Sequence, residues 1–296
     1  MISLDSIKNI LIMGSGTLGL RIGLNCAMHG YNVKIYDLSG EILAKNRKIQ
    51  EKLLKNFIEK GYYNSDTLEG VMSRIATTTS PIEAVKDIDL MSESVTENIE
   101  LKQKMYAQFA PLWEEKTILT SNTSYLMPSS LADFTGRPEL FCALHFHDVF
   151  YMNVVDVMPH PKTPQWLIDF LMAFGKKISQ IPVFIKKENP GYIFNQMLMA
   201  LLGAAGDLVT RDVSSIYDVD KSWMGNTKMH IGPFGMLDQV GLDTAWHIVS
   251  TLQDTKSKRF ADLLKSYLDQ GKLGIKTGAG FYDYPNPIFQ QPEFLK

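Results

Sequence analysis

Cysteine is scarce and charge is nearly balanced in this chain of 296 residues, and both features exclude classes of protein. The two cysteines, Cys26 and Cys142, lie in apolar stretches far apart in the sequence. We interpret them as buried thiols of a reducing compartment, not as a disulfide framework. The formal net charge is only −2, so no strongly basic surface predicts nucleic acid or an anionic membrane as a partner.

The sequence also lacks a long hydrophobic run. Residues 1–16 contain no basic leading region, and their apolar run is too short to span a bilayer. The apolar residues 197–205 are likewise too few and suit a helix of the core. No internal repeat, low-complexity block or metal-ligand spacing is present. We therefore expect a cytoplasmic protein that binds no metal, no nucleic acid and no membrane.

Short apolar runs alternate with helical patterns through the first two thirds of the chain. Strands are predicted in residues 9–14, 32–37, 88–94, 116–122, 139–146, 153–159 and 178–187. Helices are predicted to begin near Thr17, Gly40, Ile99, Met127 and Pro164. This alternation is typical of βαβ units, so it predicts an α/β fold with a mostly parallel sheet.

The rest of the pattern predicts a second, helical domain. Residues 41–74 have helical spacing that breaks at Gly61 and Asn64, which indicates a helical-hairpin insert in the first domain. The polar turn KKENPG predicts a boundary between domains 1–187 and 188–296. Helices are expected at residues 192–209, 214–224, 236–252 and 261–270, followed by a proline-rich tail.

A glycine-rich loop follows the first predicted strand. In ILIMGSGTLGLRIG, Gly14 would allow a tight turn, Gly16 the close approach of a pyrophosphate, and Gly19 close packing of helix on strand. Asp37 ends the second strand, where an acid can bind a ribose 2′-hydroxyl, although it could instead only cap the next helix. No arginine follows it, so we predict a Rossmann-type domain that binds NAD. Contacts with NAD are expected from Gly14, Gly16, Thr17, Leu18, Gly19 and Asp37.

Polar side chains follow two further predicted strands. Asn122 and Ser124 lie at the carboxyl end of the strand at 116–122, and Glu97 lies beyond the strand at 88–94. Ligands of open α/β sheets bind beyond the carboxyl ends of the strands, so Ser124 could donate to a substrate oxygen. The spacing alone favours the alternative, in which Ser124 belongs to the cap of the helix that begins near Met127. Glu97 and Lys102 could simply be part of a solvated helix face.

A histidine also ends a strand, in the stretch LHFHDVFYMNVVDV. Because histidine titrates near neutral pH, His145 can take a proton from an alcohol while a hydride leaves the same carbon. A carboxylate such as Asp156 behind it would hold the tautomer and stabilise the imidazolium. The alternative is a core histidine near an unrelated acid.

Motifs along nearly the whole chain resemble the 3-hydroxyacyl-CoA dehydrogenase family, a two-domain, NAD-dependent group. The matching segments are GSGTLG, SESVTENIELK, SNTSYL, LHFHD, NPGYIFNQML, GPFGMLDQVGLD and GKLGIKTGAGFYDY. The resemblance implies an NAD-dependent oxidoreductase of fatty acid metabolism, with a helical second domain that shapes the substrate cleft and forms a homodimer.

The resemblance also implies a role for each matching site residue. It implies that His145 is the catalytic acid/base, that Asp156 orients it, and that Ser124 and Asn195 bind the substrate's 3-oxygen. It assigns Asp37 to the NAD ribose. Glu97, Lys102 and Asn122 are then residues of the cofactor site, the first two near the nicotinamide.

The stretch that carries His145 departs from the family pattern. Relatives typically read HFFNP and carry glutamate twelve positions after the histidine, whereas here the run is HFHDV and Asp156 follows after eleven. The shorter side chain and the shorter segment could compensate each other. We interpret His147 and Asp148 as determinants of substrate choice, and residues 150–152 as a lining of the substrate's entrance.

These departures leave three functions open. The first is interconversion of 3-hydroxyacyl-CoA and 3-oxoacyl-CoA, with a substrate like 3-hydroxybutyryl-CoA. It is supported by the basic residues of the hairpin, which meets the CoA nucleotide in acyl-CoA relatives: Lys45, Arg47, Lys48, Lys52 and Lys55. The alternative is that these residues form an ordinary solvated helix face. The second is a diketoreductase-like enzyme that acts on small β-keto or β-hydroxy acids or diketo esters. The segments SNTSYLMPSSLADFTGR and KSWMGN resemble that branch of the family. The third is a catalytically weak NAD-binding protein.

Overall fold

The computed structural model describes residues 3–296, and the chain divides into two compact units after Ile193. The division follows six residues after the boundary expected at residue 187. The first unit is an α/β sheet domain and the second is helical, which confirms the predicted fold class. None of the helices in residues 3–296 is long and apolar enough to cross a bilayer.

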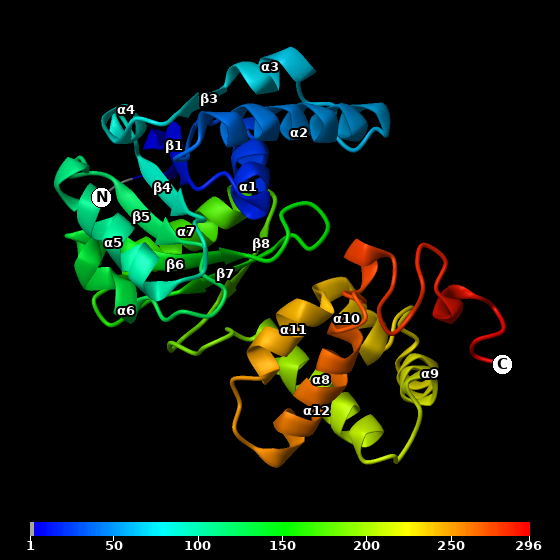
Figure 1. The fold of residues 1–296 in the computed structure, drawn as a ribbon. Coiled ribbons are helices and arrows are strands. Elements are labelled where there is room, and N and C mark those ends of the chain that lie inside the picture. Colours follow the sequence, from blue (N-terminus) through cyan, green and yellow to red (C-terminus); the bar gives the residue numbers. More distant parts are fainter. Residues whose placement is uncertain (1–2) are drawn as a thin grey trace. The chain divides into compact units, whose positions relative to one another are not determined.

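The first unit is built on one sheet of eight strands (Figure 1). The strands are β1 (Asn9–Met13), β2 (Asn32–Tyr36), β3 (Ile75–Thr78), β4 (Leu90–Glu93), β5 (Ile118–Ser121), β6 (Phe141–Phe146), β7 (Val154–Met158) and β8 (Ile181–Phe184). Their order is β3-β2-β1-β4-β5-β6-β7-β8, and only the β6–β7 pair is antiparallel. The order reverses between β1 and β4, so the ligand crevice of such a sheet lies beyond the carboxyl ends of these two strands.

Helices cover both faces of this sheet. They are α1 (Thr17–Met28), α2 (Gly40–Glu59), α3 (Leu68–Ser73), α4 (Pro81–Val85), α5 (Ile99–Phe109), α6 (Ser129–Ala132) and α7 (Gln165–Lys177). Along β1, Ile10 and Ile12 join the hydrophobic cluster that includes residues of α1 and α7. The alternate residues, Leu11 and Met13, join a separate cluster with α5. Because both faces are buried, β1 is apolar at nearly every position.

Helices α2 and α3 occupy the segment expected to form a helical hairpin (Figure 1). Leu43 and Leu54 of α2 are buried in the core cluster of the sheet, and Gln50 donates to the carbonyl oxygen of Leu20 in α1 (2.7 Å). Arg47 donates to two backbone carbonyl oxygens, those of Met72 and Ile75. One basic residue of the hairpin is therefore bound within the fold.

Two elements of the first unit, β3 and α4, are not predicted from the sequence. β3 has four residues at the edge of the sheet, and two of them, Ala76 and Thr77, are exposed. α4 has five residues, capped by the Ser80 hydroxyl. Both are too short to give a clear periodic pattern. Short 3-10 turns complete the unit at Leu4–Ser6, Ala110–Leu112, Asp133–Thr135 and Pro138–Leu140.

The second unit contains five α-helices and two 3-10 turns. They are α8 (Phe194–Thr210), α9 (Ile216–Thr227), α10 (Pro233–Val240), α11 (Leu242–Val249), α12 (Thr255–Leu268) and the turns Ile275–Thr277 and Ile288–Gln290. The single helix expected at 236–252 is wrong, since Gly241 adopts a φ of +94° and separates α10 from α11. The expected tail is also folded, because Phe289 and Phe294 are buried in the unit's core.

Two buried carboxylates hold the second unit together. Asp220 accepts hydrogen bonds from the backbone N–H groups of Phe234 and Gly235, at the start of α10. Asp238 accepts two more from the N–H groups of Phe281 and Tyr282. Together they connect α9, α10 and the segment that follows α12.

Candidate active site

The loop between β1 and α1 has the backbone of a dinucleotide site. Gly14 has a φ of +93°, and a Cβ atom there would lie 2.6 Å from the carbonyl oxygen of Ser94. A Cβ on Gly19 would lie 2.0 Å from the carbonyl oxygen of Gly14. A Cβ on Gly16 would meet nothing within 4 Å, and no side chain caps the N-terminus of α1. The first-turn N–H groups of α1 can therefore receive an anionic group such as a pyrophosphate.

Asp37 lies next to this loop, directly after β2. Its Oδ2 accepts hydrogen bonds from the backbone N–H (2.8 Å) and the hydroxyl (2.6 Å) of Ser15. Burial would raise the pKa of Asp37, but the hydrogen bonds from Ser15 and from the N–H groups of Leu38 and Ser39 lower it below its usual value. The carboxylate therefore stays ionised and can accept hydrogen bonds from ribose hydroxyls. The residues present fit NAD.

Glu93 and Lys102 form a buried ion pair at the carboxyl end of β4. Their side chains are 0% and 1% exposed, with the Lys102 Nζ atom 2.5 Å from Glu93 Oε1. Lys102 also donates to the carbonyl oxygen of Val95 (3.2 Å), and Glu93 accepts the hydroxyl of Ser121 in β5 (2.6 Å). Because the Lys102 side chain is enclosed in this way, it can influence a bound cofactor only through the residues that it contacts, such as Glu93 and Val95.

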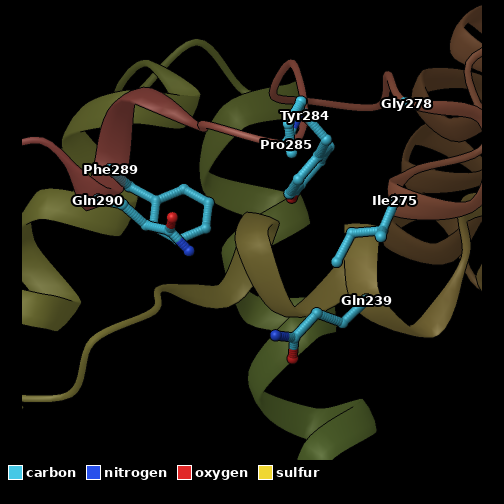
Figure 2. Close-up of a pocket in the computed structure, with 7 residues that line it drawn as sticks. All are labelled: Gln239, Ile275, Gly278, Tyr284, Pro285, Phe289 and Gln290. Atoms are coloured by element: carbon cyan, nitrogen blue, oxygen red, sulfur yellow. The ribbon is translucent and has the colours of Figure 1, made fainter.

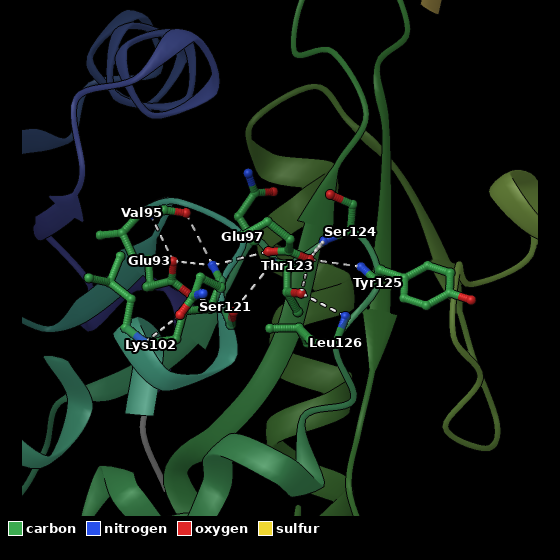
Figure 3. A network of polar contacts seen from close by, with 12 residues as sticks. Glu93, Val95, Glu97, Lys102, Ser121, Thr123, Ser124, Tyr125 and Leu126 are labelled. Carbon is green, nitrogen blue, oxygen red and sulfur yellow. Dashed lines mark hydrogen bonds and ion pairs between the residues drawn. The ribbon is translucent and has the colours of Figure 1, made fainter. Parts of the chain in front are cut away.

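Glu97 joins the loops after β4 and β5 (Figure 3). Its Oε1 accepts hydrogen bonds from the hydroxyl of Thr123 (2.5 Å) and from the N–H groups of Ser124 (2.9 Å) and Tyr125 (3.0 Å). Its Oε2 lies 3.3 Å from Lys102 Nζ. Burial would raise the pKa of Glu97, but the charge of Lys102 and these hydrogen bonds lower it. In Figure 3 the exposed Ser124 side chain points away from this carboxylate.

His145 and Asp156 lie directly opposite each other on β6 and β7. Cross-strand partners have their side chains on the same face of a sheet. The His145 Nδ1 atom is 3.2 Å from Asp156 Oδ2, and the two side chains are only 4% and 2% exposed. The shorter acid, one position earlier than in the family pattern, therefore reaches the histidine. Their catalytic roles stay predictions.

A second histidine, His147, contacts the same carboxylate oxygen. Its Nε2 atom lies 2.8 Å from Asp156 Oδ2, and its ring centroid is 4.6 Å from that of His145. The sequence predicts His147 only as a determinant of substrate choice, whereas the structure places it in the site's hydrogen-bond network. Three residues with metal-ligating side chains thus meet here, although their spacing in the sequence shows no metal motif.

The electrostatics of this cluster suit a base at neutral pH. Burial lowers the pKa of His145 below 6.5, which the hydrogen bond to Asp156 opposes and the charge of His147 reinforces. Burial would raise the pKa of Asp156, but the hydrogen bonds to His145 and His147 outweigh it and lower the pKa. His145 is consequently neutral at pH 7, with an ionised carboxylate behind it.

Tyr192 and Asn122 fix the surroundings of His145. The Tyr192 ring stacks on the imidazole (4.7 Å between centroids), and its hydroxyl donates to the carbonyl oxygen of Thr123 (2.8 Å). The Asn122 side-chain oxygen accepts the N–H of Phe146 (2.7 Å), which ties β5 to the end of β6. Tyr192 was missed from the sequence. The only signal was its place in the NPGYIFNQML segment.

Asp148, expected to be a determinant of substrate choice, holds the loop between β6 and β7 in place. Asp148 accepts the N–H groups of Phe150 (3.0 Å) and Tyr151 (3.2 Å), and it pairs with Arg21 of α1. The Phe150 ring packs on Phe57 of α2, with centroids 4.8 Å apart. Phe150 is thus part of the packing of the first unit. The side chains of Tyr151 and Met152 are exposed.

The remaining predicted residue, Asn195, belongs to the second unit, in the first turn of α8. That unit has a hollow of about 420 Å³ on its own surface (Figure 2). It is lined by Gln239, Ile275, Gly278, Tyr284, Pro285, Phe289 and Gln290. Since none of these is a predicted site residue, the hollow adds nothing to the cluster at β6 and β7.

Comparisons with known proteins match both units. Residues 9–188 match the family model "3-hydroxyacyl-CoA dehydrogenase, NAD binding domain", and residues 191–284 match its C-terminal domain. The human mitochondrial hydroxyacyl-coenzyme A dehydrogenase is 33% identical over 94% of this chain and 91% of its own. A diketoreductase structure matches with a TM-score of 0.88, at 36% identity over 94% of this chain and 99% of its own. The structure of the (S)-3-hydroxybutyryl-CoA dehydrogenase of Ralstonia eutropha matches with a TM-score of 0.86, at 29% identity over 95% of this chain and 100% of its own.

Proposed function

The chain belongs to the 3-hydroxyacyl-CoA dehydrogenase family of NAD-dependent oxidoreductases, and we propose that it interconverts a 3-hydroxyacyl-CoA and a 3-oxoacyl-CoA. A short acyl chain, as in 3-hydroxybutyryl-CoA, is the proposed substrate. The names of two relatives support this choice, the 3-hydroxybutyryl-CoA dehydrogenases of Clostridioides difficile and Ralstonia eutropha.

The proposed chemistry is a proton transfer at His145. In the oxidative direction its Nε2 atom takes the proton of the C3 hydroxyl, and Asp156 stabilises the imidazolium through Nδ1. Ser124 and Asn195 hold the reacting oxygen, which contributes positioning and electrostatic stabilisation. NAD, when bound, supplies the hydride chemistry. Gly14, Gly16, Thr17, Leu18, Gly19 and Asp37 would hold it, and Asn122, Glu97 and Lys102 would shape the nicotinamide side.

One observation carries this proposal, the contact of 3.2 Å between His145 Nδ1 and Asp156 Oδ2 across β6 and β7. An imidazole whose Nδ1 donates to a carboxylate has its Nε2 lone pair available as a base. The lowered pKa of His145 keeps that lone pair free at neutral pH.

Turnover of two 3-oxo substrates with NADH tests the substrate. We expect kcat/KM for acetoacetyl-CoA to exceed that for ethyl acetoacetate, an uncharged β-keto ester. The exposed Lys45 and Lys48 of α2 support a contact with the CoA nucleotide. The double variant Lys45→Glu/Lys48→Glu should therefore raise KM for acetoacetyl-CoA by about two- to fivefold, as for exposed ion pairs, and leave the ester unchanged. A strong preference for the ester would contradict the CoA substrate.

A second candidate is a diketoreductase-like activity on small β-keto acids or diketo esters. The likeness to the diketoreductase structure, at 36% identity, favours it. Preference for the ester in the same assay is its expected outcome.

The weakest candidate is an NAD-binding protein with little catalysis. It predicts tight NADH binding without turnover of any 3-oxo substrate, and no further loss in His145→Ala. A measurable activity that His145→Ala abolishes would exclude it.

The assembly and the compartment are also proposals. We propose a homodimer formed through the helical second unit, which sedimentation equilibrium tests directly. We propose the cytoplasm as the compartment, although the human relative is named as mitochondrial. Cell fractionation that recovers the protein with mitochondria would overturn this.

A further inference from the structure

The cluster at β6 and β7 has the side chains of a metal site. His145, His147 and Asp156 each offer one ligand atom, and these atoms lie within 4.8 Å of one another. Asp156 Oδ2 is 3.2 Å from His145 Nδ1 and 2.8 Å from His147 Nε2. Each of the three side chains is less than a tenth exposed. The antiparallel register of β6 and β7 holds Asp156 opposite His145.

These distances are close to those that zinc requires. Zn–N and Zn–O bonds of about 2.0–2.2 Å in a tetrahedron separate neighbouring ligand atoms by about 3.3–3.5 Å. The His145–Asp156 pair therefore needs to open by about 0.1–0.3 Å and the His147–Asp156 pair by about 0.5–0.7 Å. The two imidazole nitrogens, which lie within 4.8 Å of each other, need to approach by at most about 1.5 Å. Two imidazoles and one carboxylate are a common zinc donor set, whereas Mg²⁺ and Ca²⁺ prefer oxygen ligands.

We propose that His145, His147 and Asp156 form a binding site for Zn²⁺, and that the bound ion inhibits the enzyme. Zn²⁺ replaces the hydrogen bonds from the two imidazoles to Asp156, and the single proton of each neutral ring moves to its other nitrogen. A fourth position is left for water, as in zinc sites with three protein ligands. Because protons compete with Zn²⁺ for the ligand atoms, binding weakens as pH falls.

The inhibition follows from the tautomer of His145. Coordination through Nδ1 moves the single proton of the neutral ring to Nε2, which then has no lone pair to accept the proton of an alcohol. The ion also withdraws Asp156 from its role as the partner of an imidazolium. This second half of the proposal rests on the proposed function of His145, while the binding of Zn²⁺ does not.

Calorimetric titration of the full-length chain with ZnCl₂, after chelator treatment and without cofactor, tests the binding. We expect one Zn²⁺ per chain. In His147→Gln the amide can still donate to Asp156 but is a poor zinc ligand. Its Zn²⁺ affinity should fall by more than the roughly 10–100-fold typical of losing an outer partner. His230→Gln, an exposed histidine outside the cluster, is the matched control and should bind like the parent.

A second measurement avoids variants altogether. Co²⁺ added to the parent chain should give the visible absorption of a tetrahedral site with nitrogen and oxygen ligands, and Zn²⁺ should displace it. Equal Zn²⁺ affinity in the parent and His147→Gln, or no binding by the parent, would overturn the proposal. If Zn²⁺ binds at this site but does not slow turnover, the binding half stands and the assignment of His145 as the base fails.

Discussion

Buried carboxylates serve different purposes in the two units of this protein. Asp156 in the sheet domain is 2% exposed and bonds to two imidazoles. Asp220 in the helical unit is 0% exposed and accepts hydrogen bonds from two backbone N–H groups and a tyrosine hydroxyl. Burial would raise the pKa of both. The histidine bonds lower the pKa of Asp156, whereas that of Asp220 stays raised because its neutral donors do not outweigh burial.

Burial alone therefore does not mark a catalytic acid. Asp156 contacts imidazoles, side chains that can gain and lose a proton during a reaction, so a change of charge there can be coupled to catalysis. The partners of Asp220 do not titrate near neutral pH, and its hydrogen bonds instead connect α9 to the start of α10. We expect substitutions at Asp156 to change catalysis and those at Asp220 to change stability.

The largest expected effect is that of removing His145, the proposed base. His145→Ala should lower kcat/KM by about 10²–10⁴-fold, the usual contribution of general base catalysis, with NADH binding preserved. Steady-state kinetics and fluorescence titration with NADH measure the two quantities, and His230→Ala serves as the control. Unchanged turnover in His145→Ala would place the proton transfer elsewhere.

Asp156→Asn tests the catalytic side of the comparison. The amide keeps the size of the side chain but removes the charge that stabilises the imidazolium. We expect kcat to fall by about 10–100-fold, less than for His145→Ala, and KM to change little. A variant as active as the parent would show that His145 needs no ionised partner.

Asp220→Asn tests the structural side. Its amide nitrogen would face N–H groups that now donate to a carboxylate, so we expect a loss of about 1–3 kcal/mol in the free energy of unfolding. Urea denaturation measures this loss. Turnover per folded molecule should stay at the parent value. A catalytic defect in the folded protein would break the proposed division between the two carboxylates.

The smallest effect is expected in the pH profile. Because burial, and then the charge of His147, lower the pKa of His145, kcat/KM for oxidation should fall only below pH 6.5. His147→Phe removes that charge, and His145 is then the one imidazole of this pair that still bonds to Asp156. The pKa of His145 should therefore rise, and the acid limb should move to higher pH by less than about one unit. A shift to lower pH would contradict the role given to His147.

The sequence predicts the frame of the sheet domain because its signals are local. The glycine loop, the apolar strands and the position of His145 near the end of a strand can all be read from neighbouring residues. The antiparallel register that sets these two side chains opposite each other depends on the turn between β6 and β7, which local patterns do not give.

The parts that were missed depend on contacts between distant residues. Tyr192 stacks on His145 and has a φ of +55°. Residues other than glycine rarely adopt this backbone conformation, so the sequence does not predict it. The break at Gly241 interrupts a helical pattern that runs on in the sequence. His147 could have been predicted as a neighbour of His145, since residues two apart in an extended segment point to the same face. In the structure its ring contacts the same carboxylate.

The central claim is that Asp156 holds His145 with its proton on Nδ1 and its Nε2 free to act as the base. Two-dimensional ¹⁵N NMR of the histidine rings at neutral pH measures this tautomer directly, with His145→Ala used to assign the signals. The account predicts a neutral His145 ring protonated at Nδ1, and partial loss of that preference in Asp156→Asn. A His145 ring protonated at Nε2 in the parent protein would contradict it.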